Sequence, residues 1–212
     1  MENSSFFEPW VGENFHTGGI FGKKLLILGE SLYCSDCADC GVGKAHKKPY
    51  DCWTTTKSID KILNDFENTG MYKRTFTKFE KAIYGNSVDK DIRNDLWNSV
   101  LYYNFVQISL NESRKSPTSQ NFRNSDKAFF EILEQYRPDG IIAWGRRLWK
   151  NLPGGILWEE LDKIEIDGES ERCGAYTLQN GDKVKVMSIV HPSWGFTPEN
   201  WHPFIKLFIQ KL

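Results

Sequence analysis

The sequence predicts an α/β fold: a single domain, residues 1–212, with three α/β/α layers around a mainly parallel central sheet. Continuous apolar runs at residues 24–33, 140–144 and 185–190 lack polar alternation, which is typical of strands buried on both faces. Amphipathic segments lie between these runs, and alternating strands and helices favour parallel pairing with helices on both faces. No repeat, low-complexity segment or linker divides the chain, so one domain is predicted.

The first third of the chain is predicted to contain one strand and two helices. Residues 1–20 are polar and aromatic and are expected to form an irregular lead-in. After the first strand, a loop is expected to run to about residue 56. Apolar residues at helical spacing predict helices over 58–66, with a serine at the N-cap, and over 72–84.

The remaining elements follow from the same patterns. Three further helices are predicted over residues 92–99, 125–136 and 201–212, and another is predicted to begin at residue 145. A β-rich apolar run covers residues 100–110. The Asn180–Gly181 pair predicts a hairpin that joins 175–179 to 183–190.

Composition excludes several classes of protein. The net charge of −1 gives no global basic field, so a nucleic-acid ligand would need a local patch. No apolar run is long enough for a transmembrane helix, and the N-terminus lacks the pattern of a signal peptide, so a cytoplasmic protein is expected. Five cysteines, three of them crowded together, argue against a secreted disulfide framework.

The segment His191-Pro192-Ser193 comes directly after the last apolar run. A histidine at the end of a buried strand can donate a hydrogen bond to an oxygen that gains negative charge as a bond breaks. Ser193 can contact a phosphate. The alternative is a turn histidine that makes only a structural hydrogen bond.

Asn104 is an amide inside an apolar run. A buried amide needs hydrogen-bond partners, and at a strand end its donor and acceptor suit the edge of a nucleobase. The alternative is a structural amide that bridges two loops.

A cysteine cluster and two groups of cations could also bind ligands. Cys34, Cys37 and Cys40, with Cys52 or His46 as a fourth ligand, would suit a structural zinc ion or an iron–sulfur cluster; the alternative is reduced thiols in a loop.

The cationic groups suit phosphate contact through Lys47 and Arg146; the alternative is solvated surface.

Five segments resemble motifs of the uracil-DNA glycosylase superfamily, in the order that the family has them. They are LILGESLY at 26–33, DCWT at 51–54, YNFV at 103–106, IIAWGR at 141–146 and VHPS at 190–193. The resemblance spans nearly the whole chain and implies a uracil-DNA glycosylase-like fold.

The resemblance also implies roles for single residues. Tyr33 would form a wall of the pocket and exclude the methyl group of thymine. Trp53 would stack on the extruded base, and Asn104 would bind its Watson–Crick edge. His191 would stabilise the departing uracil anion, and Ser193 would touch the DNA backbone.

Three departures from the family pattern stand out. Ser31 and Leu32 stand where the family has its water-activating Asp and the Pro after it, and Glu30 stands at the family's Gln position. The resemblance therefore leaves Glu30 as a candidate base, with Asp36 or Asp39 as alternatives, and losing a positioned base costs about 10²–10⁴ in rate.

The third departure concerns the wedge that fills the gap left by the flipped base. The family's leucine is absent here, and Trp194 or Phe196 would take its place.

The resemblance implies a monomeric enzyme that hydrolyses the N-glycosidic bond of a flipped uracil or other damaged base in DNA, with no cofactor required for catalysis. Ser31 favours one alternative, a catalytically impaired protein that keeps the fold and binds a nucleobase or nucleic acid. The near-neutral charge suits another, a glycosidase acting on free nucleosides or nucleotides.

Overall fold

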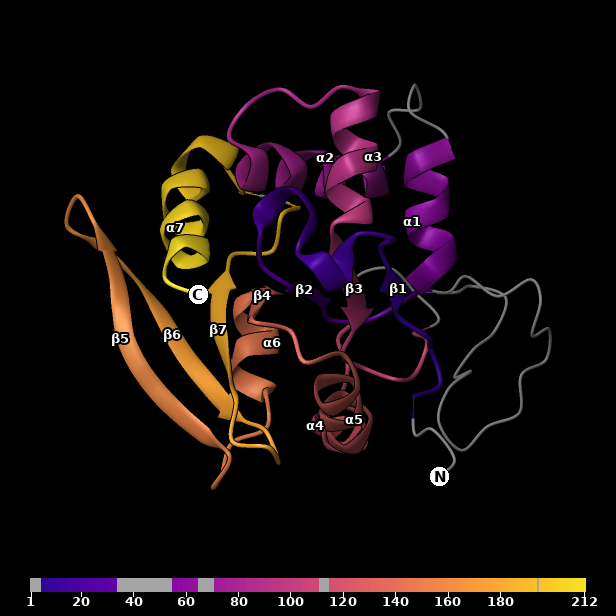
Figure 1. The fold of residues 1–212 in the computed structure, drawn as a ribbon. Helices are drawn as coiled ribbons and strands as arrows, with labels where there is room; N and C mark the ends of the chain where they lie inside the picture. Colours follow the sequence, from indigo (N-terminus) through magenta and orange to yellow (C-terminus); the bar gives the residue numbers. More distant parts are fainter. Residues whose placement is uncertain (1–4, 34–54, 65–70, 111–114, 194) are drawn as a thin grey trace.

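The computed structural model describes residues 5–33, 55–64, 71–110, 115–193 and 195–212. It confirms an α/β fold in which helices cover both faces of one seven-stranded sheet (Figure 1). The strands are β1 (Trp10–Val11), β2 (Leu25–Gly29), β3 (Val100–Asn104), β4 (Gly140–Trp144), β5 (Trp158–Ile166), β6 (Glu169–Thr177) and β7 (Lys183–Ile189). The helices are α1 (Thr55–Asn64), α2 (Met71–Tyr84), α3 (Lys90–Asn98), α4 (Ser119–Arg123), α5 (Asp126–Tyr136), α6 (Arg146–Asn151) and α7 (Pro198–Gln210), with short 3-10 turns at Phe15–Thr17 and Gly19–Phe21.

The sheet is parallel at its centre and antiparallel at both edges. Its strand order is β1-β3-β2-β4-β7-β6-β5, and β3, β2, β4 and β7 run parallel. The strand β1 joins one side in antiparallel pairing, and the β6–β5 hairpin joins the other. The expectation of a mainly parallel sheet therefore holds for the central strands alone. Because the four central strands point the same way, their carboxyl ends meet at one edge.

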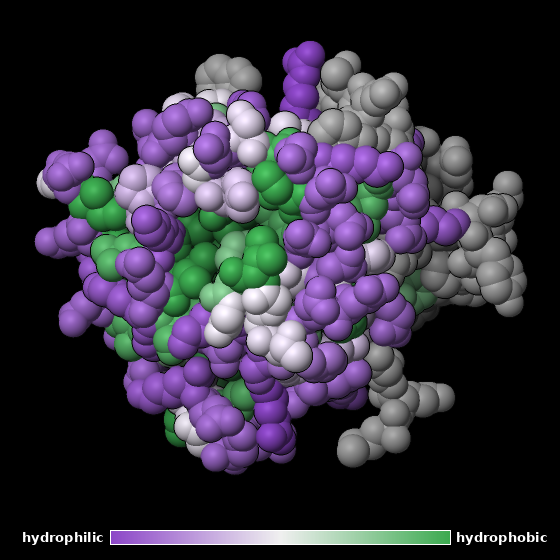
Figure 2. Space-filling model, turned by 45° about the horizontal axis from the view of Figure 1, so that its top comes forward, coloured by the Kyte–Doolittle hydropathy of each residue, from purple (hydrophilic) through white to green (hydrophobic). Residues whose placement is uncertain are grey.

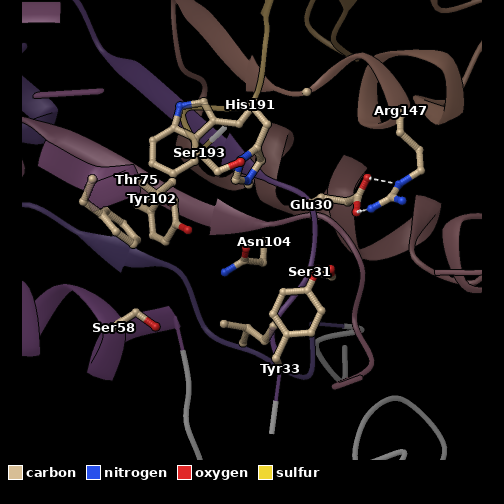
Figure 3. A pocket seen from close by; sticks show the side chains of 15 residues that line it. Glu30, Ser31, Tyr33, Ser58, Thr75, Tyr102, Asn104, Arg147, His191 and Ser193 are labelled. Atoms are coloured by element: carbon tan, nitrogen blue, oxygen red, sulfur yellow. Dashed lines mark hydrogen bonds and ion pairs between the residues drawn. The ribbon is translucent and has the colours of Figure 1, made fainter. Parts of the chain in front are cut away.

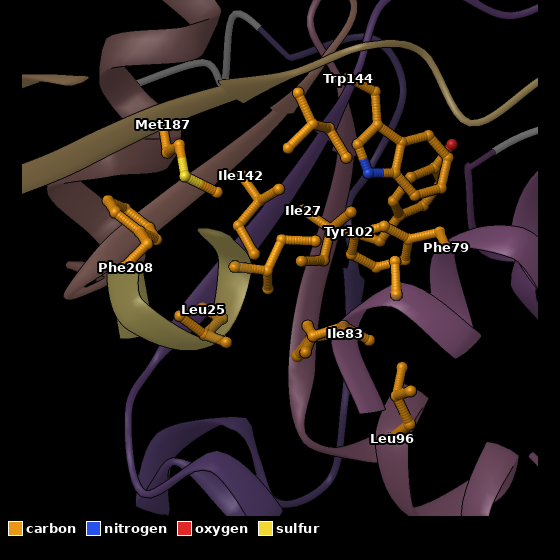
Figure 4. Close-up of a cluster of buried hydrophobic side chains, with 14 of the residues drawn as sticks. Leu25, Ile27, Phe79, Ile83, Leu96, Tyr102, Ile142, Trp144, Met187 and Phe208 are labelled. Atoms are coloured by element: carbon orange, nitrogen blue, oxygen red, sulfur yellow. The ribbon is translucent and has the colours of Figure 1, made fainter. Parts of the chain in front are cut away.

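Two apolar clusters explain the three layers. Side chains alternate along a strand, so Leu25 and Ile27 of β2 face one side, whereas Leu26 and Leu28 face the other. The first side packs against α1, α2, α3 and α7, and Figure 4 shows part of this cluster around Ile27. The second side packs against α4, α5 and α6. Each face of the sheet is therefore covered by its own layer of helices.

Several predicted boundaries change. Within the lead-in, Trp10–Val11 pairs with β3, so this segment includes an edge strand. The helix α1 begins at Thr55, which places Ser58 inside the helix and not at its N-cap. The β-rich run ends as a strand at Asn104. Ser125 stands at the N-cap of α5, but its hydroxyl donates to a backbone carbonyl of α4 and makes no cap bond.

Figure 2 shows one face of the molecule, where hydrophilic side chains cover most of the surface and hydrophobic ones gather left of its centre. No helix in the parts of the chain that the structure describes is both long and apolar enough to cross a membrane.

Candidate functional site

A cavity of about 660 Å³ lies at the carboxyl ends of the central strands (Figure 3). Gly29, Asn104 and Trp144 line it from the ends of β2, β3 and β4, and His191 lines it from the turn after β7. This is the expected place for a ligand in an open α/β sheet. The helices α1, α2 and α6 supply further lining residues, among them Ser58, Thr75, Phe76 and Arg147. The volume lies in the range of small-molecule sites.

Asn104 is held at the closed end of this cavity. Its side chain is 2% exposed, and it stands beside Gly29 in the parallel register of β3 and β2. A Cβ at Gly29 would lie 2.5 Å from Asn104 Oδ1, so only glycine leaves room for the amide. The side chain of Asn104 is also hydrogen-bonded to that of Tyr102. The sequence-predicted amide therefore lies at a strand end, inside the cavity.

His191 and Ser193 both line the cavity, and their side chains lie beside each other. His191 Nδ1 is 2.9 Å from Ser193 Oγ, and its ring meets Trp144 edge-on at a centroid distance of 6.1 Å. His191 is exposed where it faces the cavity, yet the protein around its ring removes part of its hydration. This desolvation lowers the pKa of His191, while the charge of Glu30 raises the pKa and that of Arg147 lowers it. The imidazole is therefore neutral at pH 7.

Glu30 is bound to Arg147. Arg147 Nε donates to Glu30 Oε1 at 2.7 Å, and a second guanidinium nitrogen donates to Oε2. The guanidinium also donates to Ser116 Oγ. Among the described lining residues Glu30 is the one carboxylate. Glu30, which the sequence suggests as the catalytic base, therefore has both carboxylate oxygens hydrogen-bonded to Arg147.

Ser31 and Tyr33 also line the cavity. Ser31 Oγ is buried and has no hydrogen-bond partner within the described structure, so it is open to a polar ligand atom or a water molecule. Tyr33 is 37% exposed, and Figure 3 shows its ring across the cavity from Tyr102. Tyr33 thus forms a wall of the pocket.

Two residues that are predicted to contact DNA interact with other parts of the protein. Arg146 donates to Ser188 Oγ at 3.0 Å and to Glu171 at 2.5 Å, and it lies outside the cavity lining. Phe196 is 3% exposed and stacks on Trp201, with ring planes 4° apart. Arg146 is thus bonded to Glu171 of β6, and Phe196 is packed against Trp201 of α7. Phe196 is therefore not exposed for insertion into DNA.

Ten predicted residues lie outside the described residues, and their roles stay predictions. They are Trp53, Lys47, Trp194, Asp36, Asp39, His46 and the four cysteines Cys34, Cys37, Cys40 and Cys52. Within the described ranges, no group of three or more His, Cys, Asp or Glu side chains is arranged to hold a metal ion.

Sequence reasoning missed Tyr102 and the helix residues Thr75 and Phe76 as parts of the site, and it did not pair Arg147 with Glu30. Tyr102 had a usable signal, because it precedes Asn104 by two positions in a strand and so shares its face. The α2 residues had none, because their place depends on how that helix packs on the sheet.

The amide of Asn104, the imidazole of His191 and the paired carboxylate of Glu30 thus line one cavity at the carboxyl ends of the central strands. No family model matches this chain, and no curated protein matches its sequence. The function therefore has to be inferred from the site itself.

Proposed function

We propose that the protein hydrolyses the bond between a nucleobase and deoxyribose in DNA, acting on uracil or another damaged base that has rotated out of the stack. The observation that carries the proposal is that Asn104 and His191 line one cavity, a buried amide and a neutral imidazole at the carboxyl ends of β3 and β7. An amide suits the polar edge of a base, and an imidazole suits a departing anion. The resemblance of the segments that supply them to glycosylase motifs supports the same function.

In this reaction a water oxygen forms a bond to C1′ of the sugar while the C1′–N bond breaks. The base leaves with the electron pair of that bond, and negative charge gathers on a carbonyl oxygen of the base. When the Ser193 hydroxyl donates a hydrogen bond to His191 Nδ1, the proton of the neutral imidazole is on Nε2, which can donate a hydrogen bond to that oxygen. One such donor contributes about 10²–10³ in rate. The attacking water releases its proton to solvent, and the base anion takes one up.

The nucleophile has no free carboxylate beside it among the described lining residues. Glu30 is paired with Arg147, whereas the buried hydroxyl of Ser31 is unpartnered there. We propose that Ser31 orients the attacking water without taking its proton. The enzyme should then be slower than one with an available base, by about 10²–10⁴.

The same ion pair favours a second candidate, a protein that binds an extruded base without cleaving its bond. In that case the amide and imidazole would serve recognition alone. Binding without product distinguishes this candidate from the enzyme.

The test uses single- and double-stranded oligonucleotides that contain uracil, with hypoxanthine and thymine mismatches as further substrates and free deoxyuridine as a separate arm. Alkali then cleaves any abasic site. We expect cleavage by the wild type and a loss of about 10²–10³ in His191→Ala. His16→Ala, an exposed histidine outside the cavity lining, is the matched control and should keep wild-type activity.

Equal cleavage by the wild type and His191→Ala would contradict the mechanism. Absence of abasic sites with every base, at excess protein, would overturn the glycosylase function. Base-dependent binding in that case would support the second candidate, and release of uracil from deoxyuridine alone would identify a nucleosidase.

A further inference from the structure

The turn of residues 191–193, which carries the imidazole of the site, has few backbone hydrogen bonds of its own. At the end of β7, Gly145 N donates to Ile189 O at 2.9 Å. Within the turn, Ser193 N donates to His191 O at 2.7 Å. Among the described residues, no backbone N–H donates to the carbonyl oxygen of Ser193. The end of the turn therefore depends on a side chain for its place.

That side chain is Lys78 of α2. Its Nζ donates to Ser193 O at 2.7 Å and joins two residues that are 115 positions apart in the chain. Lys78 is half-buried, and Thr75, one turn earlier on α2, lines the cavity. A hydrogen bond from an ammonium group is stronger than one between neutral groups. The helix α2 thus holds the end of the turn through a charged donor.

The effect of this bond reaches His191 through Ser193. Ser193 Oγ is 2.9 Å from His191 Nδ1, and Figure 3 shows the two side chains next to each other. Because the carbonyl and the hydroxyl belong to one residue, fixing the carbonyl of Ser193 limits where its hydroxyl can lie. The ring of Trp144 meets the imidazole edge-on at a centroid distance of 6.1 Å. A bonded hydroxyl and an aromatic ring thus hold the imidazole together.

We infer that Lys78 is a positioning residue for His191: it fixes Ser193, and Ser193 fixes the plane of the imidazole and the nitrogen that carries its proton. Lys78 lies outside the cavity lining, so it acts through the turn. The inference rests on the proposed function, in which His191 must face the departing base. A displacement of about 1 Å in a reacting group can cost about 10² in rate.

The contribution of Lys78 is geometric. The charges that shift the pKa of His191 are those of Glu30, which raises it, and Arg147, which lowers it. Removing Lys78 should therefore change the orientation of the imidazole and leave its pKa near the wild-type value.

The kinetic experiment uses the full chain and a single-stranded oligonucleotide that contains uracil. Lys78→Met keeps most of the aliphatic stem and removes the donor, so kcat should fall about ten- to a hundredfold while KM stays unchanged. Lys78→Arg supplies a charged donor again and should recover most of the rate. Lys81→Met is the matched control, because Lys81 is an exposed lysine of the same helix outside the cavity lining. It should keep the wild-type kcat.

Nitrogen NMR of the histidine ring gives a readout that needs no substrate. When one tautomer of a neutral imidazole is held, its two nitrogen signals lie far apart, and exchange between tautomers draws them together. At pH 7 we expect a wide separation for His191 in the wild type and in Lys78→Arg, and a smaller one in Lys78→Met. His191→Gln assigns the signals.

A double-mutant cycle shows whether Lys78 acts through His191. Lys78→Met should lower the rate no further once His191→Ala is present. An equal loss of rate in both backgrounds would overturn the inference and leave the proposed function standing.

Two other results would overturn the inference with the proposed function intact. One is an unchanged separation of the His191 signals in Lys78→Met. The other is a raised KM at unchanged kcat, which would mean that Lys78 contacts the ligand directly. If the wild type cleaves no base, the proposed function fails, and the role of Lys78 in catalysis fails with it. The ring signals then still report whether Lys78 holds the imidazole.

Discussion

Two arginine–glutamate ion pairs in this molecule share one geometry and differ in their surroundings. Arg93 of α3 binds Glu80 of α2 through Nε at 2.8 Å and a second nitrogen at 2.5 Å, and Arg147 of α6 binds Glu30 in the same two-pronged way. The side chains of Arg93 and Glu80 are 6% and 0% exposed. Those of Arg147 and Glu30 are 47% and 9% exposed.

The difference separates structural from functional use of the same groups. Glu80 also accepts a hydrogen bond from Trp97 Nε1 at 2.9 Å, so the inner pair ties α2 to α3 within the apolar layer that carries Phe76. The outer pair lines the cavity, and its two charges act in opposite directions on His191. The inner pair therefore supports the fold, and the outer pair sets the electrostatics of the site.

The largest contrast should appear in stability. Arg93→Met leaves the Glu80 carboxylate buried without its cation, which typically costs about 3–5 kcal/mol of unfolding free energy. Arg147→Met leaves Glu30 at the edge of a cavity that water can enter, and we expect a loss of about 1 kcal/mol or less. Urea denaturation of both variants measures the difference. Equal losses would show that exposure does not distinguish the two pairs.

The second contrast concerns proton binding. Burial is the main cause of the lowered pKa of His191, and Arg147 lowers it further while Glu30 raises it. Arg147→Gln removes one lowering charge and keeps the raising one, so the pKa of His191 should rise. The imidazole then stays protonated up to a higher pH than in the wild type. The loss of activity on the acidic side of the pH–rate profile should shift to higher pH as well.

Proton NMR titration of the histidine ring measures this shift, with the His191 signal assigned from His191→Gln. Arg172→Gln, an exposed arginine outside the cavity lining, is the matched control and should leave the titration unchanged. A pKa that stays constant or falls in Arg147→Gln would contradict the electrostatic role of the outer pair.

How far the sequence predicts the fold depends on which faces of a strand are buried. The strands β2, β4 and β7 were predictable because their apolar runs are continuous or nearly so. The strand β5 was missed because most of its side chains are charged and only Ile164 is fully buried. The Asp167–Gly168 turn was a usable signal, and both residues adopt positive φ there.

The same limit applies to the site. Asn104 and His191 were predictable because each follows a buried run, and strand ends meet at one edge. The pairing of Glu30 with Arg147 was not, because it joins residues 117 positions apart and depends on where α6 begins. Nor was the burial of Phe196, which depends on Trp201 packing against it. Local pattern thus locates reactive groups, whereas their partners come from tertiary packing.

A third ion pair gives the smallest expected effect. It tests whether solvent exposure determines how much unfolding free energy is lost when an ion pair is broken. Lys127 and Glu131 lie one turn apart on α5 at 3.6 Å, with side chains 77% and 34% exposed. Water screens the pair, and lysine stands on the N-terminal side, which is the less favourable order along a helix. Lys127 also lies in the first turn, where a cation opposes the helix dipole.

The weak attraction of Lys127 to Glu131 and its unfavourable interaction with the helix dipole nearly cancel. Lys127→Gln should therefore change the unfolding free energy by less than about 0.5 kcal/mol. Urea denaturation at low and high salt measures it, with Lys150→Gln on α6 as the matched control because that lysine forms no ion pair among the described residues. A loss above about 1 kcal/mol would mean that pair geometry outweighs solvent exposure. The inner and outer arginine pairs, which share one geometry, should then be equally costly to break, and the assignment of one to the fold and the other to the site would lose its energetic basis.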